Sequence, residues 1–308
     1  MSGADEGATG TTGTGATDAG VALPRESSAA LPPGAREVTR VGGGYINEAL
    51  RVVLEDGRTA FVKTRADAAP GEYAAEAAGL RWLAQPGALR VPSVLDVGER
   101  YLALEWVASS PEGQLSPSGA LSEAGAEELG RGLAATHAAG AECFGWTVQA
   151  RFGPLVLSNE PTPDWPRFYA ERRLLPLARE RGALSRAASD AVERVCERLG
   201  ELCGPTEPPS RLHGDLWSGN VLADGDGRPW LIDPSVYGGH REVDLAMLRL
   251  FGAPSPRLFA AYEELAPLGE GWRERVELYQ LLPLLVHAVL FGGSYATAVE
   301  RAVLRYVG

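Results

Sequence analysis

One segment constrains the fold of this 308-residue chain more than any other, because it interrupts a long stretch of helical periodicity. Residues 211–233 contain a polar loop that reads His-Gly-Asp-Leu-Trp-Ser-Gly-Asn and leads into a short apolar strand at 220–222. A turn at 224–227 then leads to a second short strand at 229–232, which ends in Asp233. The sequence therefore predicts a hairpin within a helical domain, with polar side chains where it begins and ends.

The polar side chains of this hairpin have a spacing typical of phosphoryl transfer. Asp215 and Asn220 are five residues apart, the spacing of a kinase catalytic loop, in which the carboxylate receives the acceptor proton and the amide oxygen binds magnesium. Asp233 follows thirteen residues later. Mg²⁺ prefers oxygen ligands and keeps several waters, so one carboxylate and one amide suffice beside phosphates. Either motif alone would fit a capped turn or a strand end. Together they favour Asp215 as the catalytic base and Asn220 and Asp233 as metal ligands.

The rest of the chain divides near residue 108. We predict an α+β fold of the bilobal protein-kinase-like kind, with a small, mostly antiparallel nucleotide-binding lobe at 36–107 and a larger helical catalytic and acceptor-binding lobe at 108–308. A cleft between two such lobes is a usual ligand site. The small lobe is expected to contain strands at 37–41, 49–54, 59–64, 93–97 and 101–107 and a helix at 71–83, and the large lobe helices at 122–138, 164–181, 185–203 and from 244 onward.

The first 35 residues differ in composition from both lobes. They are rich in Gly, Ala, Thr and Ser and have no apolar period. Such a segment cannot bury enough apolar surface to offset the entropy lost on ordering, so we predict a disordered tail at 1–35.

Lys63 is the only lysine of the chain, since the other 28 of its 29 basic residues are arginine. It lies on the apolar strand predicted at 59–64, where a buried ammonium needs an anionic partner. Glu76, in the following helix, is the favoured partner, and Glu72, one turn earlier, is the alternative. A strand lysine held by a helix glutamate can point at the α- and β-phosphates of a nucleotide.

Two further segments of the small lobe are candidates for nucleotide contacts. Gly42, Gly43 and Gly44, followed by Asn47, form a turn between two predicted strands, and glycines let backbone amides approach phosphate oxygens. By itself a glycine run in a hairpin is a weak signal. At the lobe junction, the backbone groups of Glu105 and Val107 could face the adenine edge.

Charge and composition limit the partners. The formal net charge is −11 and the sequence has no basic patch, so no nucleic-acid partner is expected. No apolar run approaches the roughly 18 residues that would span a bilayer, and the N-terminus lacks a secretory pattern. The odd count of three cysteines argues against a disulfide framework. We expect a cytoplasmic protein with no membrane partner, whose oligomeric state the sequence leaves open.

These motifs, in this order, resemble the fructosamine kinase family, also called ketosamine 3-kinases. The loop HGDxxxxN alone is shared with aminoglycoside, choline and homoserine kinases. Trp-Ser-Gly within the loop, with Asp-Pro-x-x-Tyr and His-Arg-Glu-x-Asp-Leu-Ala after it, distinguishes this family from those relatives. The resemblance runs from about residue 37 to 306 and rests on GGGYIN, FVK, EYAAEAAGL, LEWV, HGDLWSGN, IDPSVYGGHREVDLAM and LFGGSY.

The resemblance implies transfer of the ATP γ-phosphate to the 3-hydroxyl of a ketosamine, a sugar joined to an amine. The 3-phosphate then makes the adduct decompose, which releases the amine and amounts to deglycation. ATP and Mg²⁺ are the implied cofactors, and a small-molecule or protein-bound ketosamine is the implied acceptor. Bacterial-type members are associated with ribulosamines and erythrulosamines. The alternative is another small-molecule hydroxyl kinase of the aminoglycoside and choline kinase superfamily. A pseudokinase would be expected to have lost one of the residues that this chain retains.

The family pattern also implies roles for residues outside the phosphate cluster. Trp217 either offers an aromatic face to the sugar or packs under the loop. Arg172 and Arg173 lie in a segment that resembles the acceptor side of the family, although they could equally be surface charges. His137 and His287 are expected to be packed histidines. The segment His240, Arg241, Glu242 and Asp244 is expected to brace the metal-bearing loop.

Overall fold

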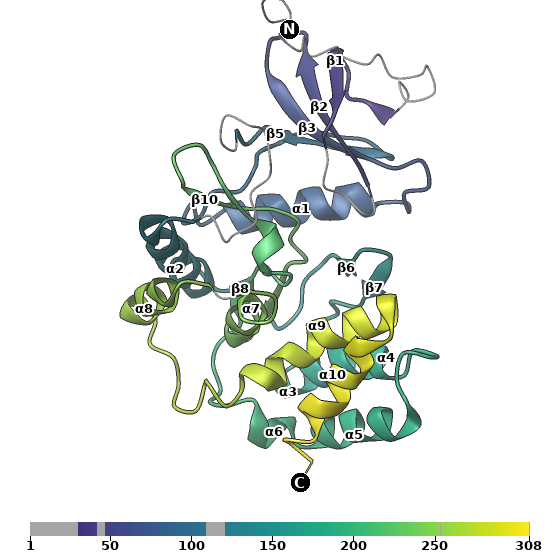
Figure 1. Cartoon of the computed structure of the whole chain (residues 1–308), viewed down its shortest axis with the longest axis vertical. Coiled ribbons are helices and arrows are strands. Elements are labelled where there is room, and N and C mark those ends of the chain that lie inside the picture. Colours follow the sequence, from purple (N-terminus) through teal and green to yellow (C-terminus); the bar gives the residue numbers. More distant parts are fainter. Residues whose placement is uncertain (1–29, 42–46, 109–120, 253, 308) are drawn as a thin grey trace, which may run out of the picture.

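The computed structural model describes residues 30–41, 47–108, 121–252 and 254–307. The tail predicted at 1–35 thus lies outside the described residues except for its last six positions, and so does the glycine run at 42–44. Within the described residues, a small β-sheet lobe lies above a larger, mainly helical lobe (Figure 1). The predicted α+β, two-lobed fold is confirmed.

The small lobe is a five-stranded sheet with one helix. The strand order is β1-β2-β3-β5-β4 and each neighbouring pair is antiparallel. The single helix, α1, follows β3 in the chain and lies beneath the sheet in Figure 1. The elements are β1 (Ala35–Arg40), β2 (Glu48–Leu54), β3 (Thr59–Thr64), α1 (Glu72–Ala84), β4 (Val94–Val97) and β5 (Tyr101–Glu105).

The alternation of side chains along β3 directs Lys63 toward the helix. Successive residues of a strand point to opposite faces of the sheet. Val62 pairs with Ala103 of β5 and packs in a small core on the face away from α1. Lys63 pairs with Leu102, which packs in the core that includes α1. The lysine side chain therefore lies on the α1 side of the sheet.

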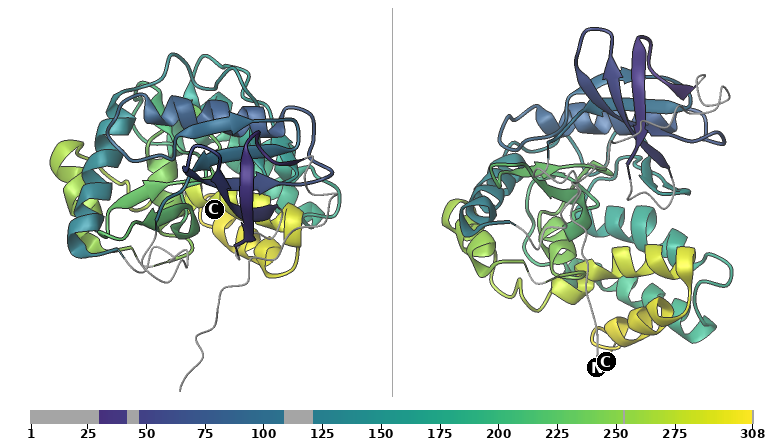
Figure 2. Two further views of the ribbon diagram at one scale, coloured as in Figure 1. Left: turned by 90° about the horizontal axis from the view of Figure 1, so that it is seen from above. Right: turned by 45° about the horizontal axis from the view of Figure 1, so that its top comes forward.

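One hydrophobic core is shared by the two lobes. Leu102 and Leu104 of β5 pack in the same cluster as Tyr73 and Leu80 of α1. Figure 1 and the right-hand view of Figure 2 place α1 between the sheet and the helical lobe. The cluster continues into the large lobe through Leu129, Leu133, Leu216, Val221, Leu231, Val236 and Leu245.

The large lobe consists of helices that surround three short two-stranded sheets. These sheets pair β6 with β7, β8 with β11, and β9 with β10. Its elements are α2 (Glu123–Ala138), β6 (Ala150–Phe152), β7 (Leu155–Leu157), α3 (Trp165–Tyr169), a π-helix (Ala170–Leu174), α4 (Leu175–Ala178), α5 (Arg186–Glu197), α6 (Leu199–Leu202), β8 (Ser210–Leu212), a 3₁₀ turn (Ser218–Asn220), β9 (Val221–Ala223), β10 (Pro229–Leu231), β11 (Tyr237–Gly239), α7 (Glu242–Leu248), α8 (Pro256–Leu265), α9 (Val276–Phe291) and α10 (Ser294–Val303).

Two predicted helices differ from the observed ones. The single helix predicted at 164–181 is two α-helical segments joined by a π-helix, and Pro176, which has no N–H to donate, lies just after the π-helix. The helix predicted at 185–203 is interrupted at Arg198, and nothing in the structure explains that break. Strands β6, β7, β8 and β11, of three residues each, were not predicted.

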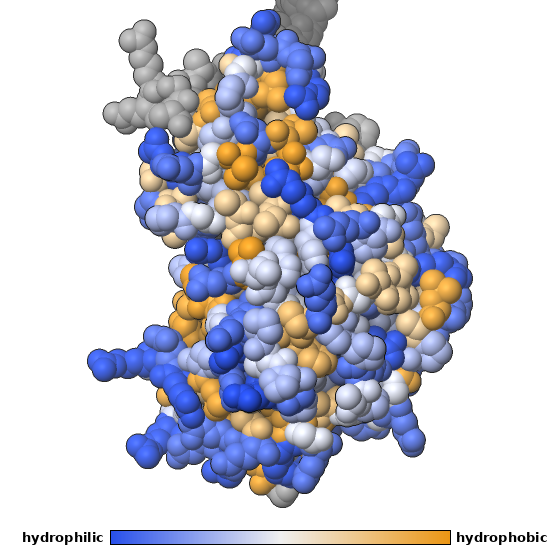
Figure 3. Space-filling view, turned by 180° about the vertical axis from the view of Figure 1, so that it is seen from behind, coloured by the Kyte–Doolittle hydropathy of each residue, from blue (hydrophilic) through white to orange (hydrophobic). Residues whose placement is uncertain are grey.

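One face of the molecule is shown in space-filling form. Seen from behind, hydrophilic side chains dominate and apolar ones form scattered patches (Figure 3). Among the described residues, no helix has the length and hydropathy needed to span a membrane.

Candidate active site

Lys63 connects the two lobes through ion pairs. Its Nζ lies 2.8 Å from Oε1 of Glu76 on α1, and it also contacts Oδ1 of Asp233, which follows β10 in the large lobe. Only 7% of the lysine is exposed. Burial opposes the charged form, but the two carboxylates, Asp233 first, hold the pKa of Lys63 above its ordinary value. A fixed ammonium therefore lies where the two lobes meet.

Glu72, the alternative partner, is engaged elsewhere. Its Oε2 lies 2.7 Å from Nη2 of Arg65 and accepts a hydrogen bond from the backbone N–H of Ala69. The contacts of Lys63 thus favour Glu76 of the two candidates.

Asp215 and Asn220 are joined across the loop between β8 and β9. Nδ2 of Asn220 donates to the backbone oxygen of Asp215 at 2.8 Å and to Oδ2 of the same residue at 3.1 Å. The 3₁₀ turn Ser218–Asn220 creates this approach by folding the loop back on itself. Because both contacts use the amide nitrogen, Oδ1 of Asn220 has no hydrogen bond to a described residue.

The carboxyl group of Asp215 titrates far from its ordinary range. Burial, followed by the negative charge of Asp233, raises the pKa of Asp215 from 3.8 to about 7, while the hydrogen bond from Asn220 opposes the rise. A carboxyl with a pKa near neutrality can take up a proton during a reaction and release it afterwards. This matches the chemistry expected of a general base.

Asp244, at the start of α7, holds the loop in place. Its two carboxylate oxygens accept hydrogen bonds from the backbone N–H groups of His213, at 2.8 Å, and Gly214, at 2.9 Å. His137 approaches the same carboxylate through Nε2 at 3.3 Å. Burial opposes ionisation, but these contacts, that of His137 foremost, keep the pKa of Asp244 below its ordinary value. The expected bracing role of this segment thus falls on Asp244, through the backbone just before Asp215.

His213 ties the loop to the strand that ends in Asp233. Its Nε2 lies 2.9 Å from the backbone oxygen of Ile232, and its Nδ1 accepts the N–H of Asp215 at 3.3 Å. Burial lowers the pKa of His213, so the ring is neutral and its proton is on Nε2, where a carbonyl accepts it. The two acidic residues, Asp215 and Asp233, are therefore held in register by one imidazole.

Two backbone positions have conformations that few residues allow. Asp233 has φ = 55°, the only positive φ among the described non-glycine residues. Gly214 has φ = +80°, and a Cβ there would lie 2.0 Å from the backbone oxygen of Ser235. The two turns are thus packed against each other, and strain at Asp233 accompanies the site.

The remaining candidates for nucleotide contact are only partly described. Gly42, Gly43 and Gly44 lie outside the described residues. Asn47 accepts a hydrogen bond from the hydroxyl of Tyr73 at 3.2 Å. The N–H of Glu105 donates to the backbone oxygen of Ser93, so this N–H is not free for a ligand. Val107 forms no backbone hydrogen bond with another described residue.

The side chains expected on the acceptor side vary in exposure. Trp217, two residues after Asp215, is 39% exposed and meets Phe251 edge-on, with 6.2 Å between ring centroids. Arg172 lies near the surface and pairs with Glu160 at 3.0 Å. Arg173, in contrast, is fully buried.

Sequence reasoning missed how Arg173 is held. Its guanidinium lies over the rings of Tyr237, 4.0 Å away, and Phe168, 4.6 Å away. Nη1 donates to the backbone oxygen of Ser158 at 2.8 Å, and Nη2 contacts Oδ1 of Asn159. The possibility of a surface charge does not hold for this residue. Arg173 lies in the π-helix, and the sequence has no pattern that predicts this π-helix.

Oxygen donors suit a hard cation at this site. No group of three or more His, Cys, Asp or Glu side chains among the described residues could hold a metal by itself. Mg²⁺, however, needs only one or two protein ligands when phosphates and waters complete its shell. The carboxylate of Asp233 and the free Oδ1 of Asn220 are of the right chemical type for that ion.

The chain is similar to known kinases over most of its length. Residues 26–307 match the family model described as fructosamine kinase. A probable ketoamine kinase of Enterococcus faecium is 34% identical over 273 residues, which cover 86% of this chain and 93% of the relative.

Solved structures agree with this similarity. A Thermobifida fusca protein described as a candidate fructosamine-3-kinase has a TM-score of 0.78 at 46% identity, covering 88% of this chain and 94% of that one. A choline/ethanolamine kinase family protein of Mesorhizobium loti has a TM-score of 0.62 at 19% identity, covering 91% and 92%, and supports the kinase-like fold alone. The family model spans both lobes and the whole residue set described above, and this chain belongs to the fructosamine kinase family.

Proposed function

We propose that this protein transfers the γ-phosphate of ATP to the 3-hydroxyl of a ketosamine, with Asp215 as the general base. The observation that carries the proposal is the contact of Lys63 with both Glu76 and Asp233. It brings a strand ammonium to the carboxylate that follows the catalytic loop, which is the arrangement that phosphoryl transfer requires. Membership of the family and the name of the Thermobifida fusca relative support the acceptor class.

In this scheme Lys63 anchors the α- and β-phosphates while Asp215 acts on the acceptor. The 3-hydroxyl oxygen forms a bond to the γ-phosphorus as the bond to the β-phosphate oxygen breaks and ADP leaves. The hydroxyl proton passes to the carboxylate of Asp215, whose pKa of about 7 suits this transfer near neutral pH. Glu76 keeps the ammonium in position.

Asn220 and Asp233 would hold Mg²⁺ beside the phosphates. The bound ion would neutralise charge on the transferred group. Asn220 also orients Asp215 through its amide nitrogen, so one side chain serves both the base and the metal site.

Trp217 is the proposed sugar contact. It lies in the loop two residues from Asp215 and remains 39% exposed, so part of the indole is open to a ligand. Sugars often present C–H groups that pack on aromatic faces, and the ring also meets Phe251 edge-on. The 3-phosphate product of such an acceptor would then decompose and release the amine.

The test is ADP release with a panel of acceptors. Ribulose-lysine, erythrulose-lysine and fructose-lysine are compared with unmodified lysine and with the free sugars, and the position of the phosphate is determined by ³¹P NMR. We expect turnover with ketosamines only, and a sugar 3-phosphate as the first product. Asp215→Asn should retain ATP binding and lose about 10²–10⁴-fold in kcat. Absence of acceptor-dependent ADP release across the panel would refute the proposal.

A further inference from the structure

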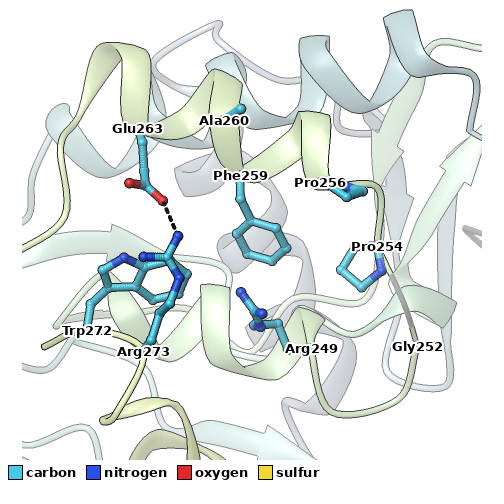
Figure 4. Close-up of a pocket in the computed structure, with 9 residues that line it drawn as sticks. All are labelled: Arg249, Gly252, Pro254, Pro256, Phe259, Ala260, Glu263, Trp272 and Arg273. Atoms are coloured by element: carbon cyan, nitrogen blue, oxygen red, sulfur yellow. Dashed lines mark ion pairs between the residues drawn. The ribbon is translucent and has the colours of Figure 1, made fainter.

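A cavity of about 620 Å³ opens in the large lobe, between the end of α7, α8 and the segment before α9 (Figure 4). It shares no lining residue with the cluster of Lys63, Glu76, Asp215, Asn220 and Asp233. The residues that line it are Arg249, Gly252, Pro254, Pro256, Phe259, Ala260, Glu263, Trp272 and Arg273.

Arg249 is a cation without an acidic partner. Its guanidinium lies 4.8 Å from the ring centroid of Phe259 and 5.4 Å from that of Trp272. No carboxylate of the described residues reaches ion-pairing distance of it. Arg257, on the same lobe, shows the usual arrangement, because it pairs with both Glu127 and Glu264. In a chain with a net charge of −11, an arginine without an acidic partner beside a cavity is a candidate site for an anion.

The other charges at the cavity largely satisfy each other. Arg273 lies 4.7 Å from the ring of Trp272 and 3.8 Å from Oε1 of Glu263. Figure 4 shows this pair at one end, while Arg249 points toward the ring of Phe259 near the middle. The single acid at the cavity is therefore directed at Arg273, and the charge of Arg249 remains available to a ligand.

The walls beside Arg249 are apolar and rigid. Phe259 is 9% exposed and Trp272 5%, and their rings stack with 6.1 Å between centroids and 27° between planes. Pro254 and Pro256 form the opposite side in Figure 4. The two rings lie beside the guanidinium of the exposed Arg249, which leaves its planar set of donors accessible from the cavity.

We propose that this cavity is a second binding site, separate from the nucleotide site, for a small molecule that carries an oxyanion on a flat apolar group. The oxyanion pairs with Arg249, and the flat group lies against the apolar part of the lining, the exposed edge of Phe259 with Pro254 and Pro256. A phosphate monoester and a carboxylate both offer the planar pair of oxygens that a guanidinium binds.

The cavity adjoins the segment 251–252, which contacts Ser218 of the catalytic loop. Gly252 lines it, and Gly252 also lies against the side chain of Ser218, which a Cβ on the glycine would approach to 3.7 Å. The preceding residue, Phe251, accepts a hydrogen bond from the hydroxyl of Ser218 at 3.1 Å. A ligand in the cavity therefore contacts the same short segment that supports Ser218.

The site is tested by calorimetric titration of the full chain, with the nucleotide site saturated by a non-hydrolysable ATP analogue and Mg²⁺. Phenyl phosphate carries both features, inorganic phosphate only the anion, and benzyl alcohol only the ring. We expect saturable binding of phenyl phosphate, at least about 10-fold weaker binding of inorganic phosphate and none of benzyl alcohol. Phenylacetate, which is a carboxylate, is compared with the neutral ester phenyl acetate. This comparison tests whether a carboxylate can replace the phosphate. The proposal requires the charged member to bind more tightly.

Variants assign the binding to Arg249. Arg249→Gln should weaken phenyl phosphate by about 10-fold or more, whereas the control Arg186→Gln, at a highly exposed arginine on α5, should leave it unchanged. If Arg249→Gln does not fold, Arg249→Lys keeps the charge but loses the planar donors and should still weaken binding. Unchanged affinity in the folded Arg249 variant, or equal affinity for benzyl alcohol and phenyl phosphate, would overturn the proposal. These titrations involve no catalysis, so their outcome is independent of the acceptor assay.

Discussion

Replacing Asp215 by asparagine should stabilise the metal-free protein while it inactivates the enzyme. The ionised carboxylate is costly in the folded state because burial and the charge of Asp233 both oppose it. A pKa raised from 3.8 to about 7 corresponds to about 1.4 kcal/mol for each pH unit between the two values, or about 4 kcal/mol in all. Because the side chain is only partly shielded from solvent, we expect about half of this cost. Asp215→Asn should therefore raise the free energy of unfolding by ~2 kcal/mol.

The sign of the effect depends on pH. Below about pH 4 the carboxyl is protonated in both the folded and the unfolded chain, so the charge costs nothing. As the pH rises, the unfolded chain loses this proton first, which favours unfolding, and the cost is complete once the pH passes about 7. Asparagine never carries the charge. Its advantage should therefore grow from about pH 4 to pH 7 and then remain constant.

The assay is thermal unfolding of both proteins in EDTA, followed by circular dichroism across this pH range. For a chain of this size, ~2 kcal/mol corresponds to an increase in Tm of about 4 °C above pH 7. Asp190→Asn, at an exposed position on α5, is the matched control and should show no pH-dependent difference. A difference in Tm that is absent at pH 8, or equally large at pH 4, would refute the reasoning.

Three further substitutions test the contacts described above. Lys63→Met removes the ammonium between two carboxylates and should weaken ATP binding by about 10-fold or more, measured by fluorescence titration; unchanged affinity would argue against the phosphate contact. Arg275→Met leaves the carboxylate of Glu242 buried without its partner at 2.6 Å and should cost about 3–5 kcal/mol in urea unfolding, most of which the added change Glu242→Gln should restore. Gly214→Ala places a Cβ 2.0 Å from the backbone oxygen of Ser235 and should lower kcat far more than it changes the KM for ATP, which steady-state kinetics would show.

The sequence predicted those parts of the site whose residues lie in one loop or in consecutive elements of the chain. Lys63 and Glu76 could be paired because a buried ammonium needs an acid and the next helix offered only two. Asp215 and Asn220 lie in one loop, so their approach follows from the loop itself. These inferences required no knowledge of how distant segments meet.

What the sequence did not reveal depends on long-range packing. Asp244 lies thirty residues after Gly214, and only the folded chain shows that its carboxylate accepts the loop amides. Arg173 is buried because a π-helix and two aromatic rings enclose it, and neither feature has a local pattern. The cavity at Arg249 likewise joins α7 to residues that follow α8.

The core shared by the two lobes has a consequence for control of the enzyme. In many kinases the helix that carries the glutamate swings in and out, and its position switches activity. Here a Cβ on Gly79 of α1 would lie 3.4 Å from the side chain of Val236, three residues after Asp233, so the helix packs against the segment that follows the proposed metal ligand. Outward movement of α1 would break this contact, so we expect α1 and the segment after Asp233 to move together.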